Sequence, residues 1–260
     1  MVFCTNDNIL SFTFRDKAVS KAKFIKGIVV NKDDRELEDL LNAWVKAITR
    51  YTSVNEYDNP WWYNERASLS VLAGAAWTLK NWLALEEFST RKRYRTLEPG
   101  IDSGSLRHGR CDLYVQSPNT SFAIEAKQTV QSIGTRSDGS TYVARAMCKA
   151  WEDSGDLSKR EADRRFAVTF IVPYIPISEV QLDDNVADKV CPIKVERAIK
   201  DWLANIPSFL GAPAKLTDFA FIFPRLGNQH YSLDGKYYPG TVIVVEERYR
   251  ANRRQVVSLE

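Results

Sequence analysis

The alternation of hydrophobic and polar positions predicts a chain that mixes helices and strands. Residues 33–51 have apolar side chains at helical spacing, and these form one stripe: Leu37, Leu40, Leu41, Trp44, Val45 and Ile48. Asn59 is a candidate N-cap and Pro60 a first-turn residue, so a second helix is predicted from Pro60 to about Phe88. Further helices are predicted over residues 141–153 and 192–205. Strands are predicted over residues 9–15, 22–30, 91–97, 110–116, 121–128, 164–173, 218–223 and 240–247.

The order of these elements indicates an α/β fold with a mixed central sheet flanked by helices. From residue 60 to residue 173 the order reads α-β-β-β-α-β. We therefore predict one domain over residues 1–260, built around an αβββαβ core at residues 58–175. An N-terminal hairpin and helix (1–57) and a C-terminal helix and strand extension (176–260) would be added to that core.

Two of the predicted strands carry charges in their interiors. Alternate side chains of a strand share a face, so Glu125 and Lys127 point the same way, opposite to Phe122, Ile124 and Ala126. Along residues 110–116 the same rule separates an apolar face from a polar one. The apolar face would hold Cys111, Leu113 and Val115, and the polar face Arg110, Asp112, Tyr114 and Gln116. The break at residues 117–120 is short enough for a hairpin, which would bring Asp112 beside Glu125.

Two neighbouring carboxylates repel each other, and a bound cation would relieve that repulsion. Oxygen ligands on two strands suit Mg²⁺ or Mn²⁺, which usually keeps waters for a phosphate substrate. Lys127 would orient an attacking water or offset charge on a phosphate oxygen. Glu65 lies at the N-terminal end of the predicted sheet-facing stripe of its helix, where it is either a partner of the helix dipole or a contributor to the metal site.

Composition narrows the class of protein. The chain has 260 residues, 44% hydrophobic content and a net charge of +3, enough for a sizeable core and too mild a charge to indicate a nucleic-acid partner by itself. The four cysteines are far apart and only two histidines are present, which disfavours a structural zinc site or a disulfide framework. The absence of a spanning apolar run or a signal-peptide pattern predicts a cytoplasmic protein with no membrane partner.

Asp112 followed by Glu125-Ala126-Lys127, after a helix that carries Glu65, resembles the PD-(D/E)XK nuclease superfamily. The resemblance covers roughly residues 60–173 and implies the restriction-endonuclease-like αβββαβ core. It implies a metal-dependent phosphodiesterase in which Asp112, Glu125 and the Ala126 carbonyl bind the metal, Lys127 is the catalytic lysine and Glu65 the helix acid. Cys111 stands where the name-giving proline would be, and the helix at 141–153 lacks the Gln-x-x-x-Tyr feature of one exonuclease branch.

The bare motif occurs a second time, as Asp218 followed by Asp234-Gly235-Lys236. We reject this match because Asp-Gly is typical of a turn and not of a strand interior. For residues 121–128 the competing interpretation is a half-exposed strand whose polar residues face water.

A basic segment precedes Asp112 in the sequence. Residues 91–110 contain six positive and two acidic side chains, and the positive ones are Arg91, Lys92, Arg93, Arg95, Arg107 and Arg110. A basic rim beside a metal site would attract a nucleic-acid backbone, whereas a solvated strand and loop would need no such role.

Several residues have two open interpretations. His108 is a base, a substrate contact or an ordinary loop residue, and Trp61 and Trp62 are base-stacking residues or packing anchors. Tyr142, Arg145 and Lys149 share one helix face that lines the cleft or faces solvent. The additions at both ends would recognise a target, form a homodimer or complete the fold.

Together these patterns predict a Mg²⁺- or Mn²⁺-dependent nuclease, with DNA favoured as substrate by the resemblance alone. The alternative is a nuclease-like domain that binds nucleic acid or a protein without cutting, because one fold hosts many functions.

Overall fold

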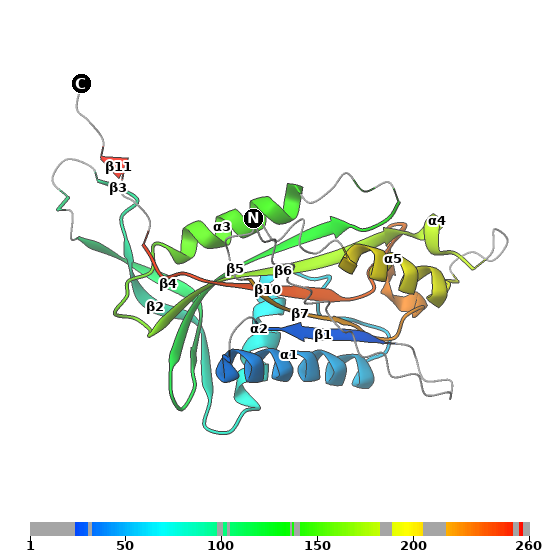
Figure 1. Ribbon diagram of the computed structural model, residues 1–260, viewed down its shortest axis with the longest axis horizontal. Helices are drawn as coiled ribbons and strands as arrows, with labels where there is room; N and C mark the ends of the chain where they lie inside the picture. The colour runs from blue at the N-terminus through cyan, green and yellow to red at the C-terminus, as the bar shows by residue number, and fades with distance from the viewer. Residues whose placement is uncertain are drawn as a thin grey trace, which may run out of the picture.

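The computed structural model describes residues 24–30, 33–97, 101–102, 105–135, 137, 141–182, 189–204, 217–251 and 255–256. Its central feature is one mixed sheet with helices on both faces (Figure 1). The strands of the sheet, in spatial order, are β1 (Ile25–Val29), β7 (Asp218–Phe223), β10 (Thr241–Glu247), β6 (Arg164–Pro176), β5 (Ser121–Ser132), β4 (Leu106–Gln116) and β2 (Leu83–Arg93). β5 and β6 pair in parallel, and the other neighbours in this order pair antiparallel.

The remaining strands of the described residues have two residues each. β8 (Ser232–Leu233) and β9 (Lys236–Tyr237) form a small hairpin that joins the end of β6. Asp234 and Gly235 connect them with φ angles of 49° and 71°, so this second copy of the motif is a turn, as the sequence predicts. β3 (Thr96–Leu97) pairs in parallel with β11 (Gln255–Val256) outside the main sheet.

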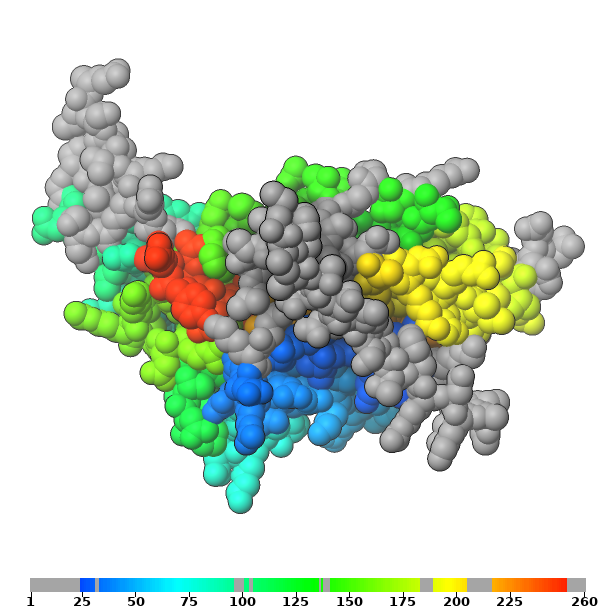
Figure 2. Space-filling view, viewed as in Figure 1, coloured from blue at the N-terminus to red at the C-terminus, as the bar shows by residue number. Residues whose placement is uncertain are grey.

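The helices cover the two faces of the sheet. α1 (Arg35–Val54) and α2 (Glu65–Trp77) pack on one face, and α3 (Thr141–Ser154) and α5 (Pro192–Ala204) lie on the other, with the short α4 (Ile177–Val180) beside α5 (Figure 1). In the space-filling view α1 (blue) lies along the lower middle of the molecule and α5 (yellow) at the right (Figure 2). The chain is thus an α/β protein in which the order α2-β2-β4-β5-α3-β6 agrees with the order predicted for residues 60–173.

α1 confirms the helix that the hydrophobic pattern predicts over residues 33–51. The side chain of Asp34 caps the helix by accepting the Leu37 N–H at 3.1 Å. All six residues of the predicted stripe are buried. Three of them, Leu37, Leu40 and Leu41, line a small apolar cavity with Leu72 of α2 and side chains of β5, β6 and β10.

The second predicted helix is wrong at both ends. α2 begins at Glu65, where the Asn64 side chain accepts the Ala67 N–H at 3.1 Å, while buried Asn59 caps only a local turn by accepting the Trp62 N–H. The helix ends at Trp77, and Asn81 has a φ of 65°, a left-handed conformation that stops helical continuation. Residues 83–88, predicted as helix, are therefore the start of β2.

The predicted N-terminal hairpin is only partly described. Residues 9–15 lie outside the described residues. The segment predicted at 22–30 contains β1, which pairs antiparallel with β7 at the edge of the main sheet.

Candidate active site at the fork between β4 and β5

β4 and β5 form the predicted hairpin and then separate. Their paired residues run from Gln116 opposite Ser121 to Leu113 opposite Ile124, and the ladder stops there. At the next position the Oδ2 atom of Asp112 accepts the Ala126 N–H at 2.8 Å, so a side chain replaces the backbone acceptor. Beyond this fork β4 continues with β2, and β5 continues with β6.

The backbone is distorted at the same level in the neighbouring strand. Glu87 of β2, which would face Asp112, has a φ of 52° and is skipped in the β2–β4 ladder. Cys111 packs with Ala123 and Leu157 in a small cluster apart from the main core, and there Phe88 stacks on Tyr114 with ring centroids 4.8 Å apart. The prediction that Cys111 shares the core face of Leu113 and Val115 is therefore wrong.

Glu125 is the buried acid of the fork. It is 2% exposed, and burial, followed by the negative charge of Asp112, raises its pKa from 4.5 to about 7 against the opposing effect of Lys92. Its Oε1 atom has no aligned hydrogen-bond donor among the described residues, although Lys92 Nζ lies 2.7 Å away as an ion pair. A buried carboxylate held beside a second carboxylate is costly for the fold unless a cation compensates it.

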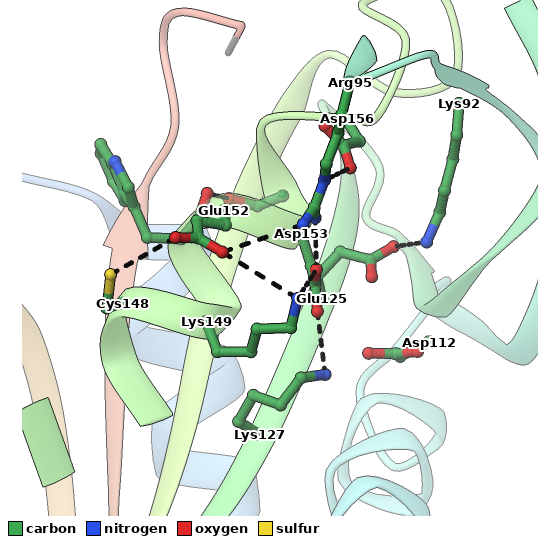
Figure 3. Close-up of polar contacts among 12 residues, drawn as sticks. Lys92, Arg95, Asp112, Glu125, Lys127, Cys148, Lys149, Glu152, Asp153 and Asp156 are labelled. Atoms are coloured by element: carbon green, nitrogen blue, oxygen red, sulfur yellow. Dashed lines mark hydrogen bonds and ion pairs between the residues drawn. The ribbon is translucent and has the colours of Figure 1, made fainter. Parts of the chain in front are cut away.

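Lys127 lies on the same side of β5 and contacts a different set of groups (Figure 3). Its Nζ donates to the Ala126 carbonyl at 2.6 Å and lies 3.3 Å from Asp153 Oδ2 and 3.9 Å from Glu65 Oε1. Burial opposes its charge, but the carboxylates of Glu65, Asp112 and Asp153 outweigh that effect and raise the pKa of Lys127. Lys127 is therefore a protonated cation at neutral pH and cannot act as a general base there.

Glu65 joins the same group from the first turn of α2. Its Oε2 accepts the Gln128 N–H at 3.2 Å, and burial raises its pKa, with Lys127 opposing that rise. The Gln128 side chain accepts the Ser68 hydroxyl hydrogen at 2.7 Å and so ties α2 to β5. The structure thus brings together Glu65, Asp112, Glu125 and Lys127, as the sequence predicts.

Three more residues complete the site: Lys149 and Asp153 of α3, and Asp156 in the turn after it. The sequence pattern indicated Lys149 but neither of the two acids. Asp153 lies 3.3 Å from Lys127 Nζ, 3.2 Å from Lys149 Nζ and 2.6 Å from an Arg95 nitrogen (Figure 3). Arg95 also contacts Asp156 at 2.5 Å. The i, i+4 spacing of Lys149 and Asp153 was the available sequence signal, and Lys149 lines the site.

The predicted basic rim divides into two groups. Lys92 and Arg95 turn inward to the ion pairs described above. Arg91, Arg107 and Arg110 are exposed on the β2–β4 arm and Arg93 is half-buried, with Arg110 3.4 Å from Glu87. His108 is also exposed on β4, 3.3 Å from the Ser89 hydroxyl. Of the two tryptophans, Trp61 is a packing anchor that is 1% exposed and donates to the Tyr238 carbonyl.

The residues at the fork fit a hard divalent cation with few protein ligands. Among the described residues no three His, Cys, Asp or Glu side chains are close enough to hold a metal by themselves. Oxygen donors from two strands are available here: the Asp112 carboxylate, Glu125 Oε1, which pairs with Lys92, and the Ala126 carbonyl, which accepts from Lys127. Such a set suits Mg²⁺ or Mn²⁺, which retains waters where a protein offers few ligands.

None of the helices in the described ranges is long and apolar enough to cross a lipid bilayer. Comparison of the chain with protein-family models, with curated proteins and with solved structures found no match.

Proposed function

We propose that the protein is a Mg²⁺- or Mn²⁺-dependent nuclease that hydrolyses phosphodiester bonds, with DNA as the favoured substrate, and that its αβββαβ segment is a restriction-endonuclease-like core. The observation that carries this proposal is the fork itself. Two strands separate so that Asp112 and the buried Glu125 lie together, with the protonated Lys127 on the same face. The resemblance to the PD-(D/E)XK superfamily assigns chemistry to the same residues.

The chain's own groups have distinct tasks in this proposal. Asp112, Glu125 and the Ala126 carbonyl would hold the divalent ion, which supplies positive charge to the phosphoryl group when bound. Lys127 stabilises charge on a phosphate oxygen as a fixed cation, because its acidic neighbours keep it protonated. Glu65 and Asp153 hold Lys127 from α2 and α3, so three elements fix its position.

The exposed arginines of the β2–β4 arm support a polyanionic substrate. Arg91, Arg107 and Arg110 lie on strands that lead directly to Asp112. Positive charge beside a carboxylate site attracts a phosphate backbone without reading its sequence.

A second candidate function is a domain of this kind that binds nucleic acid without cutting it. The Lys92–Glu125 ion pair favours this alternative, because it compensates the buried acid without a metal. Cleavage separates the two functions.

The test is a cleavage assay on supercoiled DNA, linear DNA and RNA with Mg²⁺, Mn²⁺ or a chelator. We expect metal-dependent cleavage by the wild type and none by Glu125→Ala or Lys127→Ala, with Lys80→Ala, on the exposed turn between α2 and β2, as a control. Binding of nucleic acid without cleavage under any condition would favour the second candidate. Cleavage that survives in both site variants would contradict the site assignment.

A further inference from the structure

Lys92 lies on the basic arm but belongs to the carboxylate site. Its side chain is 15% exposed, against 70% for Arg110 on the neighbouring strand. Its Nζ lies 2.7 Å from Glu125 Oε1, whereas Lys127 contacts Glu65, Asp153 and the Ala126 carbonyl. The two lysines therefore neutralise different acids of the same site.

Gly109 of β4 makes room for the Lys92 side chain to reach the fork. A Cβ atom added at Gly109 would lie 3.0 Å from both Cγ and Cδ of Lys92, closer than such atoms ordinarily pack. The lysine stem thus passes over a glycine of the adjacent strand. A larger residue at position 109 would require the lysine stem to shift by a few tenths of an ångström.

The target of Lys92 is the buried Oε1 atom of Glu125, which pairs with Lys92 Nζ at 2.7 Å. Glu125 Oε1 is buried and has no aligned hydrogen-bond donor among the described residues. It also lies beside Asp112, whose charge opposes the ionisation of Glu125. One lysine cation on that oxygen therefore occupies the place where a divalent cation would be bound most strongly.

We propose that Lys92 is an internal counter-cation of Glu125, which a divalent ion must displace, and that it thereby sets the metal affinity of the site. This inference rests on the proposed function. A lysine ammonium and a divalent ion on the same carboxylate oxygen repel each other, so one excludes the other. The flexible four-carbon stem of lysine allows the ammonium to leave while its base stays in β2.

The test is calorimetric titration of Mn²⁺ into the wild type and into Lys92→Met, which keeps the length of the stem and removes its charge. The titration is done at pH 8, above the pKa of about 7 of Glu125, so that the carboxylate is ionised. We expect Lys92→Met to bind Mn²⁺ at least about tenfold more tightly, because the competing charge is absent. Lys80→Met makes the same change of net charge on an exposed turn and should leave Mn²⁺ affinity unchanged.

Thermal unfolding without metal gives a second measurement. The midpoint of Lys92→Met should fall below that of the wild type, and added Mn²⁺ should raise it by more than it raises the wild type. Gly109→Ala keeps the lysine charge but displaces its stem, so it should strengthen Mn²⁺ binding by a smaller factor. This variant preserves the test if Lys92→Met fails to fold.

The outcomes distinguish this inference from the proposed function. If the wild type binds Mn²⁺ and both variants bind it more tightly, the inference is supported. If the wild type binds Mn²⁺ and the folded variants bind it equally or more weakly, Lys92 does not have this role, and the nuclease proposal still stands. Failure of the wild type and both variants to bind Mn²⁺ or Mg²⁺ overturns the metal site and this inference together.

Discussion

At the scale of single residues, the site is defined by a conflict of charges that the backbone imposes. The Ala126 N–H holds the carboxylate of Asp112, and the β5–β6 ladder fixes the backbone of Glu125, whose side chain is buried. Burial then makes ionisation of Glu125 unfavourable until a cation approaches. The arrangement should therefore lower the stability of the fold, and a bound cation should relieve that cost.

The first prediction concerns the pH dependence of stability in the metal-free protein. The pKa of Glu125 is raised from 4.5 to about 7, so the folded state binds more protons than the unfolded state between these values. Stability should therefore fall as pH rises through this interval, by on the order of 3 kcal/mol from this group. Chemical denaturation of Glu125→Gln should show a smaller fall over the same interval, and an unchanged slope would contradict the raised pKa.

The second prediction concerns Lys127 and its charge. Lys127→Met should reduce the rate of DNA cleavage by about 10²–10³-fold, the usual effect of removing one group that stabilises transition-state charge. Because Lys127 stays protonated, the pH–rate profile of the wild type should show no ionisation of this lysine near neutral pH. Lys127→Arg, which keeps the charge, should retain more activity than Lys127→Met, and equal loss in both would argue against an electrostatic role.

At the scale of elements, α3 holds the lysine in place through Asp153. The carboxylate is 18% exposed and contacts Arg95, Lys127 and Lys149, which join β5 to the helix and to the segment after β2. Asp153→Asn should lower the free energy of unfolding by roughly 1–3 kcal/mol, because charged partners lose a half-buried acid. Glu152→Gln on the same helix, with its acid 50% exposed, should change it by less than about 0.5 kcal/mol in denaturant titrations. Equal effects of the two changes would contradict a specific role of Asp153.

Sequence patterns predicted most helices and strands, because alternation in strands and spacing in helices are local. They also predicted that four residues of the candidate site lie together: Glu65, Asp112, Glu125 and Lys127. Glu125 and Lys127 share a face for that reason, and the short 117–120 break sets the register that places Asp112 beside them. The position of Cys111 could not be predicted in this way. It accompanies a left-handed backbone at Glu87 in the neighbouring strand, and glutamate gives no sequence signal for such a conformation.

The roles of Lys92 and Arg95 were also beyond local patterns. Both belong to a run of basic residues that is typical of a solvated or nucleic-acid-binding surface. Their acidic partners are more than thirty positions away for Lys92 and nearly sixty for Arg95, and only the folded sheet brings them together. The predicted boundary between α2 and β2 was wrong because Leu83 fits the apolar spacing of the helix although it lies in an edge strand.

At the scale of the whole molecule, the sheet joins the carboxylate fork to the basic arm, whose arginines lie on both faces of the β2–β4 pair. Arg107 pairs with Lys92 and shares its face, whereas Arg91 and Arg110 lie on the opposite face of the arm. A nucleic-acid backbone bound at Arg107 would therefore lie on the face that leads to the fork. Such binding releases counterions and is therefore sensitive to salt.

The matching prediction is a salt titration of DNA binding in the presence of Ca²⁺, chosen as a cation to limit cleavage. The logarithm of affinity should fall linearly with the logarithm of salt concentration. Arg107→Ala should make that slope shallower by about 0.9, the value for one lost phosphate contact. Lys80→Ala should leave the slope unchanged. A slope unaffected by Arg107→Ala would exclude this arginine from the interface.

The central claim is that the fork between β4 and β5 is a metal-dependent active site. Anomalous diffraction from crystals grown with Mn²⁺ tests it most directly, because it locates the ion without reference to activity. We expect a manganese peak at the oxygens of Asp112 and Glu125 that disappears in Glu125→Gln. A peak elsewhere in the molecule, or an empty fork at saturating Mn²⁺, would contradict it.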